Sequence, residues 1–171
     1  MRHKPLCLDR CGRVSQSEEV LAALRRVGDM VEQGVTPEGT YGGWSGHDVL
    51  VHLGAYTRLV GAMLCGAAEH RQPTDTELFG RKLTESERAM TDLDAINHAV
   101  IGEHAHLSYA EVHELWRTLH NRALDAAARL SDEQLAAPGP DYAPRWWRPH
   151  LSEVVTKLTV HCDAHMSGQP H

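Results

Sequence analysis

Residues 44–66 read WSGHDVLVHLGAYTRLVGAMLCG, and this stretch decides the class of fold. Ser45 is a residue type favoured at the position that caps the start of a helix. The side chains after it repeat at intervals of three and four residues along one face: Val49, His52, Leu53, Tyr56, Leu59, Val60 and Met63. Such spacing is typical of an amphipathic helix. We therefore predict a helix from Ser45 to about Gly66 whose inward face carries a histidine and a tyrosine.

Similar helical patterns occur on both sides of this stretch. A helix opened by Ser17 is ended by Gly34 and Pro37, and further helices are predicted over residues 85–104, 108–130 and about 150–166. Residues 69–83 are polar and read as a long connection. Because several amphipathic helices share one short chain, we expect an all-α fold, an antiparallel four-helix bundle. The bundle domain is predicted to span residues 15–169, after a flexible N-terminal segment of residues 1–14.

The composition limits the classes of partner. The chain has 17 Lys and Arg against 23 Asp and Glu, a formal net charge of −6, so we expect neither nucleic acid nor a membrane as partner. Its apolar stretches are broken well before the roughly 18 residues that cross a bilayer, and no signal peptide is evident. These features predict a cytoplasmic protein whose four cysteines are free thiols. A metal or redox pair of Cys7 and Cys11 is the alternative.

Among the 13 histidines, spacing selects a few. His161 and His165 stand four residues apart on the last predicted helix, so both imidazoles project from one face and can point at one ion. His52, on the inward face of its own helix, is the best candidate for a third ligand. The alternative is a core histidine bonded to a backbone carbonyl or a carboxylate. The other histidines, among them His113 and His120, are expected on the surface.

The order of these motifs resembles a known superfamily. Residues 43–53, GWSGHDVLVHL, resemble the opening of the second helix in the DinB/YfiT-like four-helix bundles, and residues 151–169 resemble their closing helix. Residues 94–97 and 130–135 match members described as mycothiol-dependent maleylpyruvate isomerase N-terminal domains or as ClbS/DfsB-type. The resemblance covers residues 15–169 and implies metal ligation by His52, His161 and His165. Because members of the superfamily often pair, it also implies a homodimer.

Three neutral imidazoles leave a position open on the ion, as catalytic metal sites do. Such an ion lowers the pKa of bound water or holds a thiol as thiolate. Zn or Ni is the expected metal, although Cu and Fe suit the same ligands. The resemblance implies a low-molecular-weight thiol such as mycothiol as a cofactor, and thiol transfer, isomerisation or hydrolysis of a small electrophile. A binding or sequestration protein without turnover, and histidines with a purely structural role, are the alternatives.

Other side chains are candidates near such a site. Tyr56, one helical turn after His52, is placed to donate a hydrogen bond to a substrate, or else packs in the core. Arg148 follows two tryptophans and suits a ligand with a carboxylate or a sugar, or else is solvated. Asp48 is a candidate to hold the free ring nitrogen of His52, or else an exposed carboxylate at a helix start.

Overall fold

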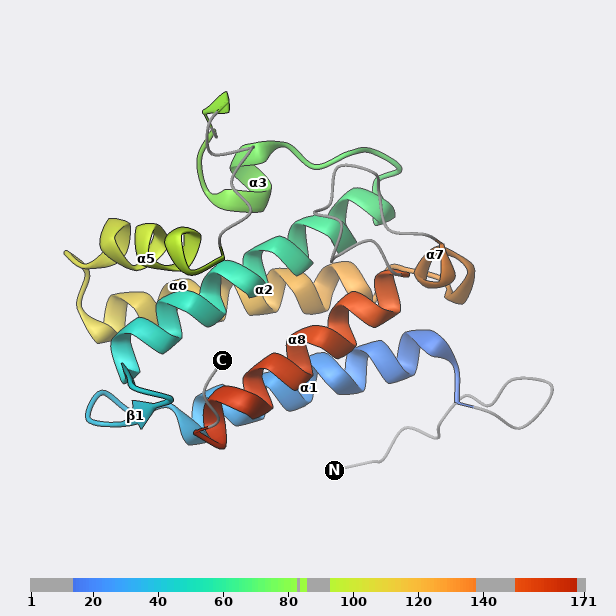
Figure 1. The fold of residues 1–171 in the computed structure, drawn as a ribbon. Helices are drawn as coiled ribbons and strands as arrows, with labels where there is room; N and C mark the ends of the chain where they lie inside the picture. The colour runs from blue at the N-terminus through green and yellow to red at the C-terminus, as the bar shows by residue number, and fades with distance from the viewer. Residues whose placement is uncertain (1–13, 83, 86–92, 138–149, 169–171) are drawn as a thin grey trace.

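The computed structural model describes residues 14–82, 84–85, 93–137 and 150–168 (Figure 1). The described helices are α1 (Gln16–Gly34), α2 (Gly46–Ala68), α3 (Asp75–Phe79), α5 (Leu93–His104), α6 (Tyr109–Ala127), α7 (Asp132–Ala136) and α8 (Leu151–Met166). Helix dominates these residues, so the predicted all-α class is confirmed. The N-terminal segment predicted to be flexible lies almost wholly outside the described residues.

Serine side chains cap α1, α2 and α6, although α1 is capped by Ser15 and not by the predicted Ser17. The Ser45 hydroxyl accepts a hydrogen bond from the Asp48 N–H at 3.1 Å, and Ser15 caps α1 in the same way. Ser108 and Glu111 form a reciprocal capping box before α6. Each cap satisfies an N–H group that the first helical turn leaves without a partner.

The four long helices pack in an order that differs from simple alternation. α1 and α8 run side by side in the same direction, because Gln16 contacts Ser152 near their starts and Arg26 contacts Asp163 further along (Figure 1). α1 and α6 run antiparallel, with the Tyr109 hydroxyl at the start of α6 donating to the Val35 carbonyl just after α1.

α2 and α6 are also parallel neighbours. His47 in the first turn of α2 contacts the Leu107 carbonyl just before α6, and Gly61 lies against Ala123 further along. The long connection through α3 and α5 returns the chain to the end where α2 began. The predicted antiparallel order therefore describes α1/α6 and α2/α8, and it is wrong for α1/α8 and α2/α6.

Helix α2 lies at the centre of the core. Most of its residues are buried, among them Leu50, Leu53, Val60 and Met63. By length and composition it is also apolar enough to cross a membrane, with 83% of the relevant window buried inside the fold. A helix that is apolar on nearly all sides is the one that other helices surround.

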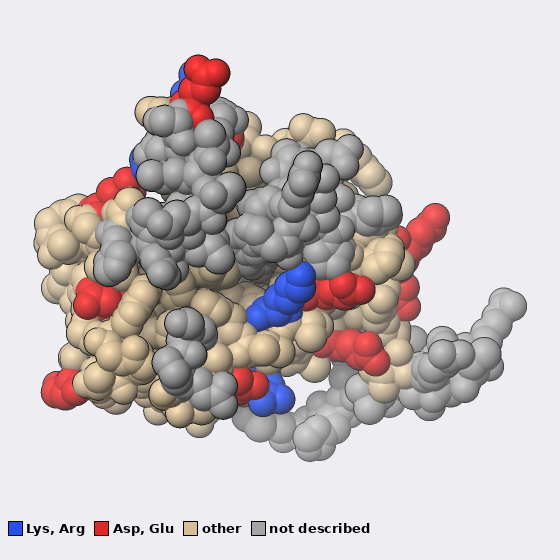
Figure 2. Space-filling view, viewed as in Figure 1, with Lys and Arg blue, Asp and Glu red and all other residues tan. Residues whose placement is uncertain are grey.

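On the face seen in Figure 2, much of the described surface is uncharged, and basic side chains lie beside acidic ones.

A short hairpin, which the sequence did not predict, fixes the start of α2. Strands β1 (Thr40–Tyr41) and β2 (Trp44–Ser45) pair antiparallel around Gly42 and Gly43, whose φ angles of 62° and 91° suit glycine. The Tyr41 hydroxyl donates to the Gly34 carbonyl at 2.6 Å. The hairpin is thereby tied to the end of α1.

Glycine is required where this hairpin meets α2. A Cβ atom added to Gly46 would overlap the Thr36 carbonyl oxygen, whereas one added to Gly54, two turns later on α2, meets nothing within 4 Å. The close approach at Gly46 sets the position from which α2 carries His52.

We predict opposite effects for alanine at these two positions. Gly46→Ala should lower the free energy of unfolding by up to about 3 kcal/mol, because the backbone at Thr36 and Pro37 must shift. Gly54→Ala should raise it by about 0.5–1 kcal/mol, since alanine favours the helix. Urea denaturation of the two variants measures both effects, and equal effects would contradict the close approach at Gly46.

Candidate metal centre

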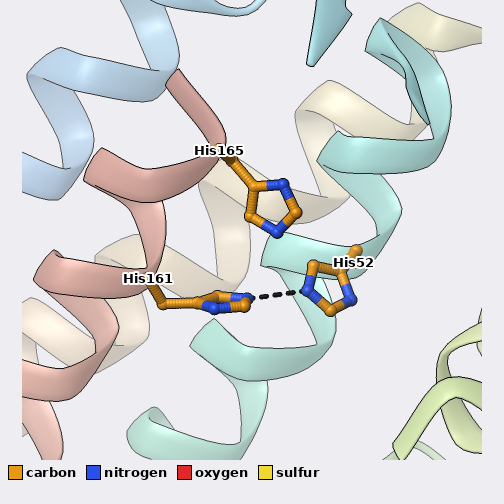
Figure 3. Close-up of side chains that lie close together, drawn as sticks. All are labelled: His52, His161 and His165. Atoms are coloured by element: carbon orange, nitrogen blue, oxygen red, sulfur yellow. Dashed lines mark hydrogen bonds between the residues drawn. The ribbon is translucent and has the colours of Figure 1, made fainter. Parts of the chain in front are cut away.

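Three histidine side chains point toward one another where α2 packs against α8 (Figure 3). The Nε2 atoms of His52 and His161 are 2.7 Å apart, and the three ring centroids are separated by 4.8–4.9 Å. One nitrogen from each ring fits in a group whose members all lie within 4.8 Å of one another. The structure thus brings together the three residues that the sequence selected.

The local folding explains this convergence. The four-residue spacing on α8 stacks His161 and His165 on one face, and the antiparallel packing of α2 brings His52 opposite them. His52 and His165 are only 3% and 1% exposed, whereas His161 is partly exposed. The cluster is therefore mostly buried, with one ligand residue closer to solvent.

Two aromatic side chains flank the cluster. The Tyr56 ring lies 4.4 Å from that of His161 and 4.9 Å from that of His52. Burial raises the pKa of the Tyr56 phenol, so it is protonated at neutral pH and able to donate a hydrogen bond. The indole of Trp44 lies 4.7 Å from the His52 ring and 5.8 Å from the His165 ring. The helical periodicity of the sequence did not predict that Trp44 lies beside the histidines, because Trp44 precedes α2.

The donor set fits a divalent transition metal. Zn–N bonds of about 2.0–2.1 Å at tetrahedral angles separate ligand nitrogens by roughly 3.3 Å. The Nε2 atoms of His52 and His161 are closer together than this, at 2.7 Å. The most widely separated nitrogens of the group, at up to 4.8 Å, are farther apart than this. A bound ion would therefore require rotation of the imidazole rings. Because the ligands are neutral, the full charge of the ion would remain in a mostly buried place, which favours an anionic further ligand.

Neither nearby aspartate joins the cluster. The Asp48 carboxylate accepts a hydrogen bond from the Ser45 hydroxyl at 2.7 Å and lies 3.2 Å from His47 Nδ1. The prediction that Asp48 holds His52 is therefore wrong, because the carboxylate serves the helix start. Asp163 pairs with Arg26 of α1 at 2.8 Å.

Cys162 and Arg117 do not join the cluster, and the remaining candidates from the sequence lie outside the described residues. Cys162 follows His161 but is fully buried in the core, where burial raises its pKa to about 12 and keeps the thiol protonated. Arg117 pairs with Glu32 and Glu114 on the surface. Arg148, with the two tryptophans before it, and Cys7 and Cys11 lie outside the described residues.

One histidine outside the cluster corrects an expectation. His120 is only 5% exposed, stacked 5.0 Å from the Trp116 ring and packed against Gly28 of α1, so its predicted surface position is wrong. Its helix is amphipathic, and the i+4 spacing from Trp116 indicated the shared inward face. Burial lowers the His120 pKa, although Glu32 and Asp29 on α1 act in the opposite direction.

Comparison with protein-family models, with curated proteins and with solved structures found no match to this chain. The interpretation of the site therefore rests on its own residues.

We predict that His120 makes stability depend on pH. The ordinary pKa of a histidine is about 6.5, and burial lowers that of His120 in the native state. Below pH 6.5 the unfolded chain therefore binds a proton at His120 more readily than the native protein does. The free energy of unfolding consequently falls as the pH decreases. One such proton contributes a slope of at most about 1.4 kcal/mol per pH unit. Urea denaturation between pH 8 and pH 5 should show a shallower fall for His120→Gln than for the wild type. Identical slopes in the two proteins would contradict this role.

Proposed function

We propose that this chain is a DinB/YfiT-like four-helix bundle in which His52, His161 and His165 bind one divalent metal ion, Zn or Ni. The observation that carries the proposal is the convergence of three imidazoles, from α2 and α8, within 4.8 Å. The packing of α1, α2, α6 and α8 and the positions of the superfamily-like motifs at the starts of α2 and α8 support the bundle.

We further propose that the site makes the protein an enzyme acting on a small electrophile, by thiol transfer or isomerisation with a mycothiol-type thiol or by hydrolysis. When bound, the ion supplies Lewis-acid activation of a thiol or water. The three histidines fill part of its coordination sphere and leave room for a small-molecule ligand. We place this enzyme in the cytoplasm, as a homodimer without a nucleic-acid or membrane partner.

The chain's own residues have distinct tasks in this proposal. The partial exposure of His161 provides an approach for the ligand from solvent. The Trp44 indole covers His52 and His165 and keeps water from that side. The neutral phenol of Tyr56 donates a hydrogen bond to charge that develops on the substrate.

A second candidate function is metal-dependent binding or sequestration of a small molecule without turnover. One observation favours it: among the described residues, the cluster includes no Asp or Glu that would serve as a general base beside the ion. A resistance protein that only holds its ligand needs no such base.

Metal analysis of protein purified without a histidine tag tests the site. We expect about one equivalent of Zn or Ni in the wild type and loss of that metal in His161→Ala/His165→Ala, because one remaining imidazole holds an ion weakly. The matched control is His104→Ala/His106→Ala, which removes two histidines of α5 and the turn after it. Absence of metal after reconstitution, or equal loss in both variants at unchanged helicity, would assign the histidines a structural role.

Tyr56→Phe separates catalysis from sequestration. With mycothiol or water and a panel of electrophiles, we expect the variant to keep its metal and to lose about 10²–10³ in kcat, the effect of one donor lost from the transition state. Tight ligand binding by the wild type without turnover favours sequestration. Turnover that Tyr56→Phe leaves unchanged would contradict the role of the phenol.

A further inference from the structure

The indole of Trp44 lies against two of the three clustered histidines. Its ring centroid is 4.7 Å from that of His52, with 67° between the ring planes, and 5.8 Å from that of His165, with 55° between the planes. Both distances fall in the range of about 4.5–7 Å over which aromatic rings attract one another. Tyr56 lies on the other part of the cluster, 4.4 Å from the His161 ring and 4.9 Å from that of His52. The two aromatic side chains therefore support different imidazoles.

The three imidazoles differ in their freedom to turn. An imidazole rotates about two side-chain bonds, and close packing on its sides opposes that rotation. His52 and His165 are 3% and 1% exposed and have Trp44 beside them. His161 is partly exposed, so solvent leaves room for its ring to move. We therefore expect His161 to be the most mobile of the three.

The shortest contact of the cluster involves this mobile ring. The Nε2 atoms of His52 and His161 are 2.7 Å apart (Figure 3). Two nitrogens bound to one tetrahedral zinc ion are roughly 3.3 Å apart, so this pair must separate when an ion binds. Rotation of His161 alone separates the pair and leaves the two rings beside Trp44 in place.

The position of Trp44 is fixed from outside the cluster. Trp44 pairs with Tyr41 across the β1–β2 hairpin. The Tyr41 hydroxyl donates to the Gly34 carbonyl at 2.6 Å and accepts from the Thr36 N–H at 2.7 Å, which ties the hairpin to the end of α1. The next residue, Ser45, caps α2. The indole is thus attached both to α1 and to the start of α2.

We propose that Trp44 is a positioning residue of the metal centre. Its indole holds the imidazoles of His52 and His165 as a fixed pair of ligands, and His161 is the ligand that moves when the ion binds. This inference rests on the proposed metal site. Side chains that orient metal ligands without touching the ion typically raise the affinity about 10–100-fold. Carboxylates often have this task, but Asp48 and Asp163 are bound elsewhere, and Trp44 orients the rings by packing.

Titration of the metal-free full chain with Co²⁺, and with Zn²⁺ in competition with a chelator, tests the role of Trp44. Trp44→Leu should weaken the apparent affinity about 10–100-fold, and Trp44→Phe, which keeps an aromatic ring, should weaken it less. At saturating Co²⁺ the visible absorption reports the arrangement of the ligands. It should differ between Trp44→Leu and the wild type, because the two imidazoles are no longer held. A loss of stability alone would leave the absorption of the bound ion unchanged.

Crystal structures with and without Zn²⁺ test the movement of His161. In the zinc-bound protein the separation of the His52 and His161 Nε2 atoms should increase from 2.7 Å. The contacts of Trp44 with His52 and His165 should be kept. Rotation of His52 away from Trp44, with His161 in place, would contradict the assignment of the moving ligand.

Trp116→Phe is the matched control. Trp116 is a buried tryptophan of α6 whose ring contacts are with His113 and His120, so this variant should bind Co²⁺ with the affinity and absorption of the wild type. Circular dichroism checks that all variants keep their helicity. A wild type that binds neither ion would overturn the metal site and this inference together. If the wild type binds, unchanged affinity and absorption in Trp44→Leu, or equal weakening in Trp116→Phe, would overturn only the positioning role.

Discussion

The burial of α2 between α6 and α8 is the constraint on which the rest of the structure depends. Its apolar surface is large enough on both sides to require a helix on each, and those two neighbours create the two polar features of the molecule. Against α8 the polar contact is a group of imidazoles, and against α6 it is a group of guanidiniums and carboxylates. One core helix thus contributes to both polar features.

The two polar features differ in how they carry charge. In the proposed metal site each ligand would be a neutral imidazole, so the histidines would bring no negative charge to an incoming cation. The groove between α2 and α6 is lined by Arg122 and Arg129 and by Glu69 and Asp125, so its fixed charges balance.

Much of the candidate site was predictable because helix periodicity is a local property. The spacing of His161 and His165 fixes their common face, and the placement of His52 among apolar residues fixes its inward direction. The direction of the helices was not predictable in this way. Whether α1 lies parallel or antiparallel to α8 depends on the path of the connections, and a polar connection such as residues 69–83 has no repeating pattern that would indicate its path.

Tertiary contacts likewise decided what the sequence could not. The hairpin at residues 40–45 is too short for an alternating pattern, and it places Trp44 against the histidines. Asp48 lies one turn before His52, yet the stronger local bond to Ser45 determines its orientation. A polar residue such as His120 is ordinarily expected on the surface. It is buried here because Gly28 on α1 leaves space for its imidazole ring.

The parallel pairing of α1 with α8 also has a consequence for biosynthesis. Gln16 meets a partner 136 positions later in the chain, and Arg26 one 137 positions later. During translation the part of α1 that packs against α8 therefore stays uncovered until the ribosome has made α8. Such distant contacts slow folding and expose nascent chains to aggregation.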